Sequence, residues 1–505
     1  MQDRFRARLV AVLLGLVIGL TGCADLTSGL AGVGRPSATP LTLVVADIAQ
    51  VVSSATAAAT SPAASPTSVA TATMAATFTP PPTATFSPTA TATASPSPTA
   101  TASPSATVVP ATPTLIPTPP TVSPTPWPTP DGPLTWDERA LLFDELWKLV
   151  NERYIDPNFN GVNWAAQWEA RRARALEAQT DTAFYEQLRE MVWTLNDGHS
   201  RFMDPHEAFD HFAASRNTLT YGGLGLYTFD TPDGALVLQV DPGSPAERAG
   251  ILSCDRILSL NGGRYNGDGG EVGSTAALTI QRPGAGTFNL TLAREEVTQV
   301  LDVPGEVLPG RSERIGYVRI DTLWVLDTPD RLRARLARLE EEGPLDGLII
   351  DLRPNLGGWR PVLQGILGTF TQGQLGEFYG RLQSDPLVAP RRDDPPPSHP
   401  DLPLVVLVSE HTESYAEVLA ATLRAERGAV IIGEPTRGNV ETIFPRRLPF
   451  GARVWIAEQG FRLNSGATLE GVGVQPDVVD HTDWTPYACG RDPQVDMAAI
   501  LLEND

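Results

Sequence analysis

Ser414 has the clearest sequence context for chemistry. It stands between the apolar run 404–408, which is typical of a buried strand, and a helical pattern that ends at Gly428. At the start of a helix, unpaired N–H groups and the positive dipole end favour a developing oxyanion. Ser414 could therefore act as a nucleophile, although a serine at this position also serves as an ordinary helix cap.

The other reactive side chains narrow the chemistry. The chain has three cysteines, Cys23, Cys254 and Cys489, and six histidines, and none of them shows metal-ligand spacing. We therefore expect no metal and no cofactor. Lys148 is the only lysine in the chain.

Length and charge set outer limits on function. The chain has 505 residues, and residues 133–505 are ample for a large core. The net charge of −21 argues against binding to nucleic acid and against docking on anionic lipid. We interpret it as a solvating acidic surface.

The first 132 residues predict export and a tether. Residues 1–22 have a signal-peptide layout, with basic residues followed by an apolar run. The run ends in Leu-Thr-Gly-Cys, which resembles a bacterial lipoprotein box with Cys23 as the lipidation site; an ordinary signal with a chance cysteine is the alternative. Residues 23–132 are rich in Pro, Thr, Ser and Ala and predict a disordered, lipid-anchored stalk.

The elements that must position Ser414 follow the stalk. Helical periodicity covers 136–154, 164–178 and 182–195, which predicts a helical bundle over 133–217. Short alternating strands and glycine turns over 218–298 predict a mainly-β domain. Residues 299–485 return to α/β patterning, and 486–505 form a C-terminal tail.

The α/β part contains a strand–helix–strand unit around Ser414, with its second strand at 429–432. A unit of this length predicts two parallel strands joined by a crossover helix. Another buried strand, in GLIIDLRPNLGGW, runs into the Gly357-Gly358 turn. The fold class is an α/β domain with a small N-terminal helical bundle and an inserted mainly-β domain.

Residues 221–296 resemble a PDZ domain of the protease-associated kind. The resemblance rests on YGGLGLYTFD, on DPGSPAERAGI and on the strands that follow. In that family the loop Gly223, Leu224, Gly225 and Leu226 would offer N–H groups to a peptide's terminal carboxylate, beside a strand to which the peptide adds. Cys254 departs from the family, which usually has glycine there.

Residues 133–480 resemble the C-terminal processing (tail-specific) protease family and the related tricorn protease core. NDGHSRF, the PDZ loop, DLRPNLGG, the Ser414 segment, GEPTRG and GVGVQPD occur in the family's order. The resemblance implies Ser414 as nucleophile in the cleavage of polypeptides. It implies the N–H of Tyr415 and one from Gly357 or Gly358 as oxyanion donors, because glycine lets the backbone face a substrate.

The expected base is missing. Processing proteases of this family use a lysine 25 residues after the serine, and this chain has Asn439 there. Arg437 cannot replace it, because a guanidinium does not lose its proton in proteins. A serine–lysine dyad is excluded.

Two functional interpretations remain. The tricorn-like branch uses a histidine and a late glutamate, which His199 and Glu470 match, with His411 as a fallback base. Histidine suits the task because its ordinary pKa is about 6.5 and a carboxylate can hold its tautomer. The alternative is an inactive homologue that binds peptide tails. A purely structural surface protein would leave these motifs unexplained.

Overall fold

The computed structural model describes residues 132–487 and 491–504. The predicted signal peptide, Cys23 and the predicted stalk as far as residue 131 lie outside the described residues. In the described ranges, no helix has the length and apolar character that crossing a membrane requires.

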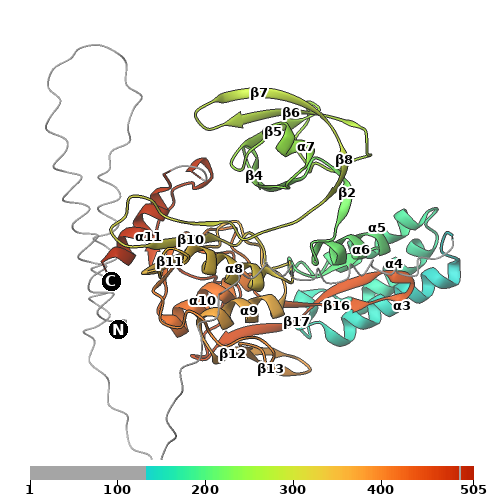
Figure 1. Ribbon diagram of the computed structural model, residues 1–505. Helices are drawn as coiled ribbons and strands as arrows, with labels where there is room; N and C mark the ends of the chain where they lie inside the picture. The colour runs from blue at the N-terminus through green and yellow to red at the C-terminus, as the bar shows by residue number, and fades with distance from the viewer. Residues whose placement is uncertain (1–131, 488–490, 505) are drawn as a thin grey trace, which may run out of the picture. The chain divides into compact units, whose positions relative to one another are not determined.

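A six-stranded sheet carries the segment that leads to Ser414 (Figure 1). In spatial order its strands are β18 (Val478–Val479), β15 (Val430–Gly433), β14 (Leu404–Val408), β11 (Gly347–Asp351), β10 (Ile315–Arg319) and β9 (Gly305–Val307). All neighbouring strands are parallel except β9, which runs antiparallel to β10. The predicted parallel crossover from β14 through helix α10 (Tyr415–Arg427) to β15 is confirmed.

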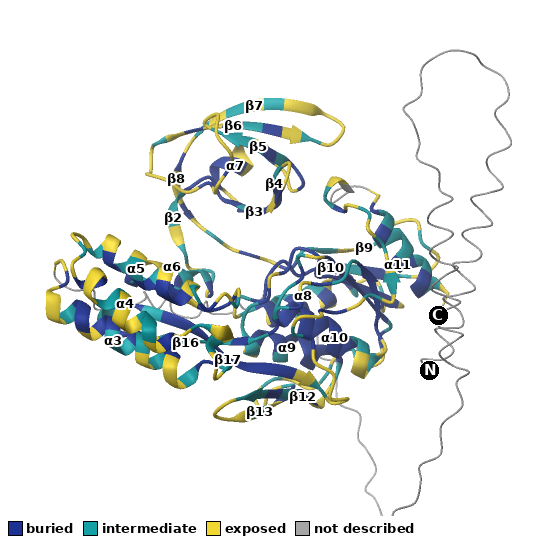
Figure 2. Ribbon diagram, turned by 180° about the vertical axis from the view of Figure 1, so that it is seen from behind, coloured by how far each residue is buried: buried dark blue, intermediate teal, exposed yellow. Residues whose placement is uncertain are grey.

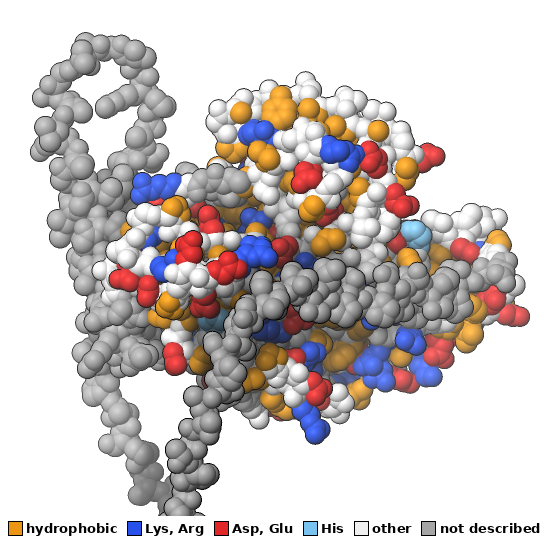
Figure 3. Space-filling model, in the orientation of Figure 1, with side chains coloured by type: hydrophobic (Ala, Val, Ile, Leu, Met, Phe, Trp, Pro, Cys, Tyr) orange, Lys and Arg blue, Asp and Glu red, His pale blue; other side chains and the backbone are white. Residues whose placement is uncertain are grey.

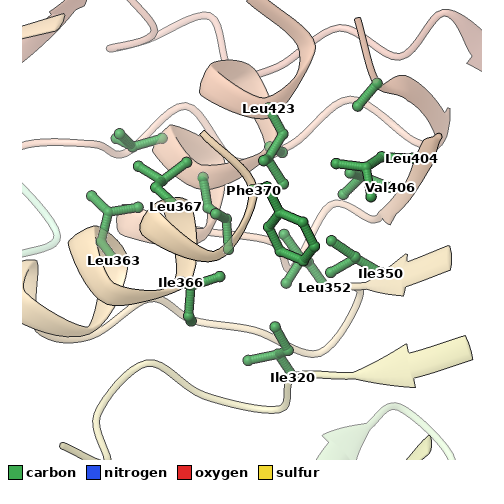
Figure 4. Packing of buried hydrophobic residues seen from close by; sticks show 14 of the residues in the cluster. Ile320, Ile350, Leu352, Leu363, Ile366, Leu367, Phe370, Leu404, Val406 and Leu423 are labelled. Carbon is green, nitrogen blue, oxygen red and sulfur yellow. The ribbon is translucent and has the colours of Figure 1, made fainter. Parts of the chain in front are cut away.

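Helices cover both faces of this sheet. Helices α8 (Thr328–Leu339), α9 (Arg360–Phe370) and α10 pack on one face, and α11 (Pro493–Glu503) packs on the other. Because successive side chains of a strand point to opposite faces, Val406 belongs to the first core and Val405 to the second. Figure 4 shows Phe370 of α9 among the side chains of the first core. The α/β fold expected for this region is confirmed.

The helical bundle comes before the sheet in the chain. Its helices are α3 (Trp136–Arg153), α4 (Trp164–Leu176), α5 (Asp181–Trp193) and α6 (Pro205–Ala214), with the short 3-10 helix η1 (Phe159–Gly161). The first three helices match the predicted periodic segments to within two residues. Helix α6, which begins at Pro205 behind an Asp204 cap, was not predicted.

A second sheet joins the bundle to the α/β domain. Its strands are β1 (Arg201–Met203), β17 (Arg453–Leu463), β12 (Gly373–Gly380), β13 (Ser384–Ala389) and β16 (Thr442–Arg447). Strand β1 pairs antiparallel with β17, and residues of β17 share a hydrophobic core with the bundle helices. Figure 2 shows β17 and the nearby helices α9 and α10 largely buried. The loop that contains His199 is thereby fixed against the α/β domain, two residues before β1.

The inserted sheet domain spans residues 220–298. It contains β3 (Leu226–Thr231), β4 (Gly234–Val240), β5 (Arg256–Leu260), β6 (Thr275–Arg282) and β7 (Gly286–Ala293) in spatial order, with the short helix α7 (Pro245–Arg248) and the pair β2 (Thr220–Gly223) and β8 (Glu295–Thr298). Strand β3 is an edge strand of this sheet. A buried guanidinium, that of Arg319 on β10, donates to the carbonyl oxygen of Leu238 on β4 at 2.9 Å. The domain is therefore held against the α/β sheet by a buried polar contact.

Cys254 shows why glycine suits its position. Its φ is +73°, a left-handed backbone conformation that residues other than glycine rarely adopt. The residue is buried in a small cluster with Leu236 and Trp484, and it is disulfide-bonded. The turn keeps the glycine-type backbone although a cysteine occupies it.

Charges lie interspersed on the face shown in Figure 3. Several arginines are paired, for example Arg189 with Asp204 at 2.6 Å and with Glu207 at 2.8 Å. Such partly exposed pairs contribute about 0–1 kcal/mol each, so the hydrophobic clusters carry most of the stability.

Candidate active site

Ser414 lies at the turn between β14 and α10 in a strained backbone conformation. Its φ is 59° and its ψ is −128°, which is rare for any residue with a side chain. Such conformations cost about 1–3 kcal/mol and cluster at functional sites. A serine held on a sharp strand-to-helix turn has its hydroxyl exposed for attack, as in nucleophile elbows.

The Gly357-Gly358 turn lies directly against Ser414. A Cβ atom added to Gly357 would stand 2.7 Å from the Ser414 Cβ and 3.0 Å from the Tyr415 nitrogen. Gly357 has a φ of +84°, so both its backbone and the available space require glycine. The structure thus places this turn beside the serine, as the sequence predicts.

Two backbone N–H groups at this junction have no acceptor within residues 132–487 and 491–504. The N–H groups of Tyr415 and Gly358 donate no hydrogen bond to any described residue, whereas the N–H of Gly357 donates to Asn355 Oδ1 at 2.8 Å. Asn355 is fully buried, and its carbonyl oxygen also accepts the N–H of Glu413 at 3.0 Å. Of the two glycines, Gly358 is therefore the one with a donor to offer. The sequence did not single out Asn355, which looks like an ordinary turn residue.

Glu417 is a buried carboxylate that links the serine turn to the segment after β15. Its side chain accepts the N–H of Ser414 at 2.9 Å, of Gly438 at 2.7 Å and of Asn439 at 3.0 Å, and the Thr436 hydroxyl at 2.5 Å. Burial raises the pKa of Glu417, and these hydrogen bonds oppose that rise. Glu417 was missed because a glutamate in the first turn of a helix normally indicates only a cap.

His199 lies beside Asn439, on the side of the site that the bundle loop provides. A Cβ atom on the preceding Gly198 would stand 3.1 Å from Asn439 Nδ2, and the imidazole hydrogen-bonds to the Asn439 backbone. Its Nε2 is buried and has no hydrogen-bond partner among the described residues. Burial lowers the pKa of His199 to about 4, although the nearby Asp197 raises it in part. The ring is therefore neutral at pH 7, with one nitrogen held by the backbone and the other available to take a proton.

Glu470 accepts a hydrogen bond from the residue that follows Asn439. Its Oε2 accepts the N–H of Val440 at 2.8 Å, and the expected contact between Glu470 and His199 is not among the interactions of the described residues. Burial raises the pKa of Glu470. Burial, with the nearby Glu470 and Asp197, raises the pKa of Glu441 to about 8. The segment that follows Asn439 therefore lies near several carboxyl groups, those of Asp197, Glu441 and Glu470.

The remaining basic candidates are directed elsewhere. His411 packs its ring edge-on against Phe229 of β3, with centroids 5.0 Å apart. Lys148 lies on α3 near Glu145, at 3.7 Å, and Arg437 is largely exposed beside Glu413. Among the described residues, no group of three or more histidine, cysteine, aspartate or glutamate side chains could hold a metal ion.

The predicted carboxylate-binding loop is occupied. The N–H groups of Leu224, Gly225 and Leu226 all donate to one carboxylate oxygen of Asp268, while Gly223 pairs within β2 and β8. The loop therefore has the geometry of an anion site, and the anion in this structure belongs to the chain itself.

Replacing Gly357 by alanine is expected to lower hydrolysis of an unfolded polypeptide by roughly 10²–10³-fold, the effect of losing one oxyanion donor. The new methyl group would push on Ser414 and displace the turn. Gly466 offers a matched control, because its φ is also +84° and a Cβ there meets nothing within 4 Å. The measurement is kcat/KM for both variants. An unchanged rate for Gly357→Ala would show that the turn does not shape the site.

Comparison with known proteins gives two family matches. Residues 314–480 match the model of peptidase family S41, and residues 137–192 match that of the tricorn protease C1 domain. The carboxyl-terminal-processing protease of Picosynechococcus sp. is 27% identical over 396 residues, which cover 73% of this chain and 90% of the relative. The chloroplastic carboxyl-terminal-processing peptidase 2 of Arabidopsis thaliana is 29% identical and covers 67% of this chain and 68% of the relative.

Among solved structures, the photosystem II D1 C-terminal processing protease matches 68% of this chain and 94% of its own, with 27% identity and a TM-score of 0.47. The tricorn protease matches 73% of this chain and 37% of its own, with 19% identity and a TM-score of 0.42. The chain thus carries a peptidase family S41 domain after a tricorn C1 match, and its relatives are carboxyl-terminal-processing proteases, which supports a serine-type peptidase.

Proposed function

We propose that this protein is a serine endopeptidase that cleaves polypeptides through an acyl-enzyme on Ser414. The observation that carries the proposal is the strained Ser414 turn, packed against Gly357 and flanked by two N–H groups that have no acceptor in the described part of the chain. A site built only for stability would favour glycine at this φ and would leave no donors unused.

The reaction follows from these groups. The Ser414 hydroxyl attacks the substrate carbonyl carbon while His199 Nε2 takes its proton. The N–H groups of Tyr415 and Gly358 hold the resulting oxyanion. The tetrahedral species then expels the amine, which receives the proton from His199. A water molecule, deprotonated by the same nitrogen, hydrolyses the acyl-enzyme.

The base is of the serine–histidine type in this proposal. The Nε2 of His199 is buried and has no hydrogen-bond partner among the described residues, so in this proposal it is the nitrogen that accepts the proton. Glu470 then acts one step away, by holding the Val440 N–H next to the Asn439 backbone. Contact between Nε2 and the Ser414 hydroxyl forms when substrate is bound, because catalytic hydrogen bonds often tighten in the complex.

Recognition of the substrate is assigned to the inserted sheet domain, acting as a PDZ domain. A peptide would place its terminal carboxylate on the loop Gly223 to Leu226 and add as a strand along β3, which is an edge strand. Phe229 of β3 contacts His411, three residues before Ser414. A bound peptide would therefore lie beside the segment that carries the nucleophile.

We further propose that Cys23 is lipidated and that the stalk holds the protease away from the membrane on the extracytoplasmic side. This rests on the sequence alone, because these residues lie outside the described ranges. The partners are then polypeptide substrates and a membrane, reached through the anchor.

A fluorophosphonate probe tests the proposal, because it reacts only with an activated serine hydroxyl. The chain should be labelled, and Ser414→Ala should abolish labelling. Ser465→Ala is the matched control, since Ser465 is exposed and away from the site, and it should label normally. Equal labelling of the Ser414→Ala variant would reject the assignment.

The second candidate is an inactive homologue that binds peptide tails. Asn439 in place of the lysine favours it, and so does its engagement with Glu413 at 2.6 Å through the side-chain amide. The same probe separates the two candidates, because an inactive homologue would remain unlabelled in all three forms.

A further inference from the structure

Asp268 fills the loop that was predicted to receive a peptide carboxylate. Its Oδ2 accepts the N–H of Leu224 at 2.9 Å, of Gly225 at 2.8 Å and of Leu226 at 3.1 Å. The hydroxyl of Tyr221 adds a contact at 3.1 Å to Oδ1. Three successive N–H groups converging on one oxygen form a nest for an anion, and the side chain supplies that anion.

The segment that carries Asp268 is built to hold it there. Asp268 is 5% exposed, and its carbonyl oxygen accepts the Nε–H of the buried Arg294 at 2.8 Å. The N–H of Gly270 donates to the carbonyl oxygen of Gly222 at 2.8 Å, next to the loop. The backbone at Asp268 and Gly270 is thus held in place by hydrogen bonds, and the carboxylate is buried rather than lying on the surface.

The connection that carries Asp268 could also let its carboxylate leave the loop. The connection between β5 and β6 contains no helix or strand, and Asp268 lies between Gly267 and Gly269. Gly267 has a φ of +111°, and a Cβ there would meet nothing within 4 Å. Rotation about glycine could carry the carboxylate out of the loop without moving the sheet.

We propose that Asp268 is an internal stand-in for a peptide's C-terminal carboxylate, and that it closes the recognition loop until an incoming chain end displaces it. The inference rests on the proposed role of this loop. The peptide carboxylate would replace that of Asp268 on the same three N–H donors. The exchange therefore contributes little binding free energy from these hydrogen bonds. Affinity must then come from strand addition along β3 and from side-chain contacts, and short peptides bind weakly.

The test compares full chains carrying Asp268→Ala or the control Asp233→Ala. Asp233 lies exposed in the turn between β3 and β4, so its removal changes the net charge equally without touching the loop. The probes are a short peptide with an apolar C-terminal residue and a free acid terminus, and the same peptide amidated. Calorimetry or fluorescence anisotropy gives the dissociation constants.

We expect Asp268→Ala to bind the acid peptide at least about tenfold more tightly than the wild type, a gain of about 1.4 kcal/mol. The amide should gain nothing, and Asp233→Ala should match the wild type. If all forms prefer acid to amide but Asp268→Ala shows no gain, the loop recognises carboxylates and our inference is wrong. If no form prefers the acid, the proposed recognition fails, and the inference fails with it.

Asp268→Asn covers the case in which the alanine variant does not fold. It keeps an oxygen acceptor for the three N–H groups but removes the charge. It should bind the acid peptide more tightly than the wild type, and the amides of Leu224 to Leu226 should exchange with solvent faster in its free form. Unchanged exchange and unchanged affinity together would overturn the proposal.

Discussion

Ser414→Ala should lower kcat for cleavage of an unfolded polypeptide by on the order of 10⁴–10⁶-fold, as loss of a nucleophile does in other serine proteases. The residual rate would come from the oxyanion donors and substrate binding, which the variant keeps. The measurement is single-turnover cleavage at saturating enzyme, which separates chemistry from binding. A decrease of less than about tenfold would mean that another group attacks the substrate.

Stability provides an independent reading of the same residue. Because Ser414 has a φ of 59° and a ψ of −128°, glycine should relieve strain that alanine retains. Ser414→Gly should therefore be more stable than Ser414→Ala by about 1 kcal/mol in denaturant unfolding, while both are inactive. Equal stability would show that the strained turn costs nothing, and the argument from strain to function would lose its basis.

The elements around Ser414 were predictable because their signals are local. Strand β14 has the predicted bounds, 404–408, since five apolar residues between Pro403 and the polar Ser409 are typical of a buried strand. Gly428 ends α10 in a left-handed conformation, as its position after the helical pattern indicated. The loop that contains His199 reaches the α/β domain through the pairing of β1 with β17. The proposed role of His199 requires such an approach.

Other features were beyond local patterns. Strand β17 mixes charged and apolar residues, so neither its length nor its pairing with β1, β12 and β16 was visible in the sequence. The role of Glu417 depends on Gly438 and Asn439 folding back onto its carboxylate. Asp268 stands in a glycine-rich connection with no periodicity, and only the folded domain shows that it reaches Gly225. In each case the missing information is a contact between distant parts of the chain.

His199→Ala is expected to lower kcat by roughly 10²–10⁴-fold, the usual contribution of general acid–base catalysis. Peptide binding should be unchanged, because the imidazole lies on the bundle side of the site and not in the sheet domain. Added imidazole should restore part of the rate by entering the space left by the ring. His206→Ala is the control, since that histidine is exposed and paired with Asp210 on α6.

The pH profile distinguishes a base from a structural histidine. Burial lowers the pKa of His199 to about 4, so kcat/KM should stay high as pH falls from 7 and decline only near pH 4. In His199→Ala rescued by imidazole, the decline of kcat/KM should occur at a higher pH, toward the ordinary histidine pKa of about 6.5. A structural histidine would leave the position of this limb unchanged in the rescued variant.

Folding must be followed in the same experiments, because the shift in pKa also acts on stability. The unfolded chain binds a proton on His199 below about pH 6.5, whereas the folded chain does so only below about pH 4. Stability therefore falls as pH drops through this window, and His211, whose pKa burial also lowers to about 4, adds to the effect.

Protonation of the base and unfolding of the chain can be separated by how fast activity recovers. Loss of the active protonation state reverses at once on return to pH 7, whereas unfolded enzyme must refold. An acid limb that recovers only at the refolding rate would assign His199 to stability, and the tail-binding interpretation would then take precedence.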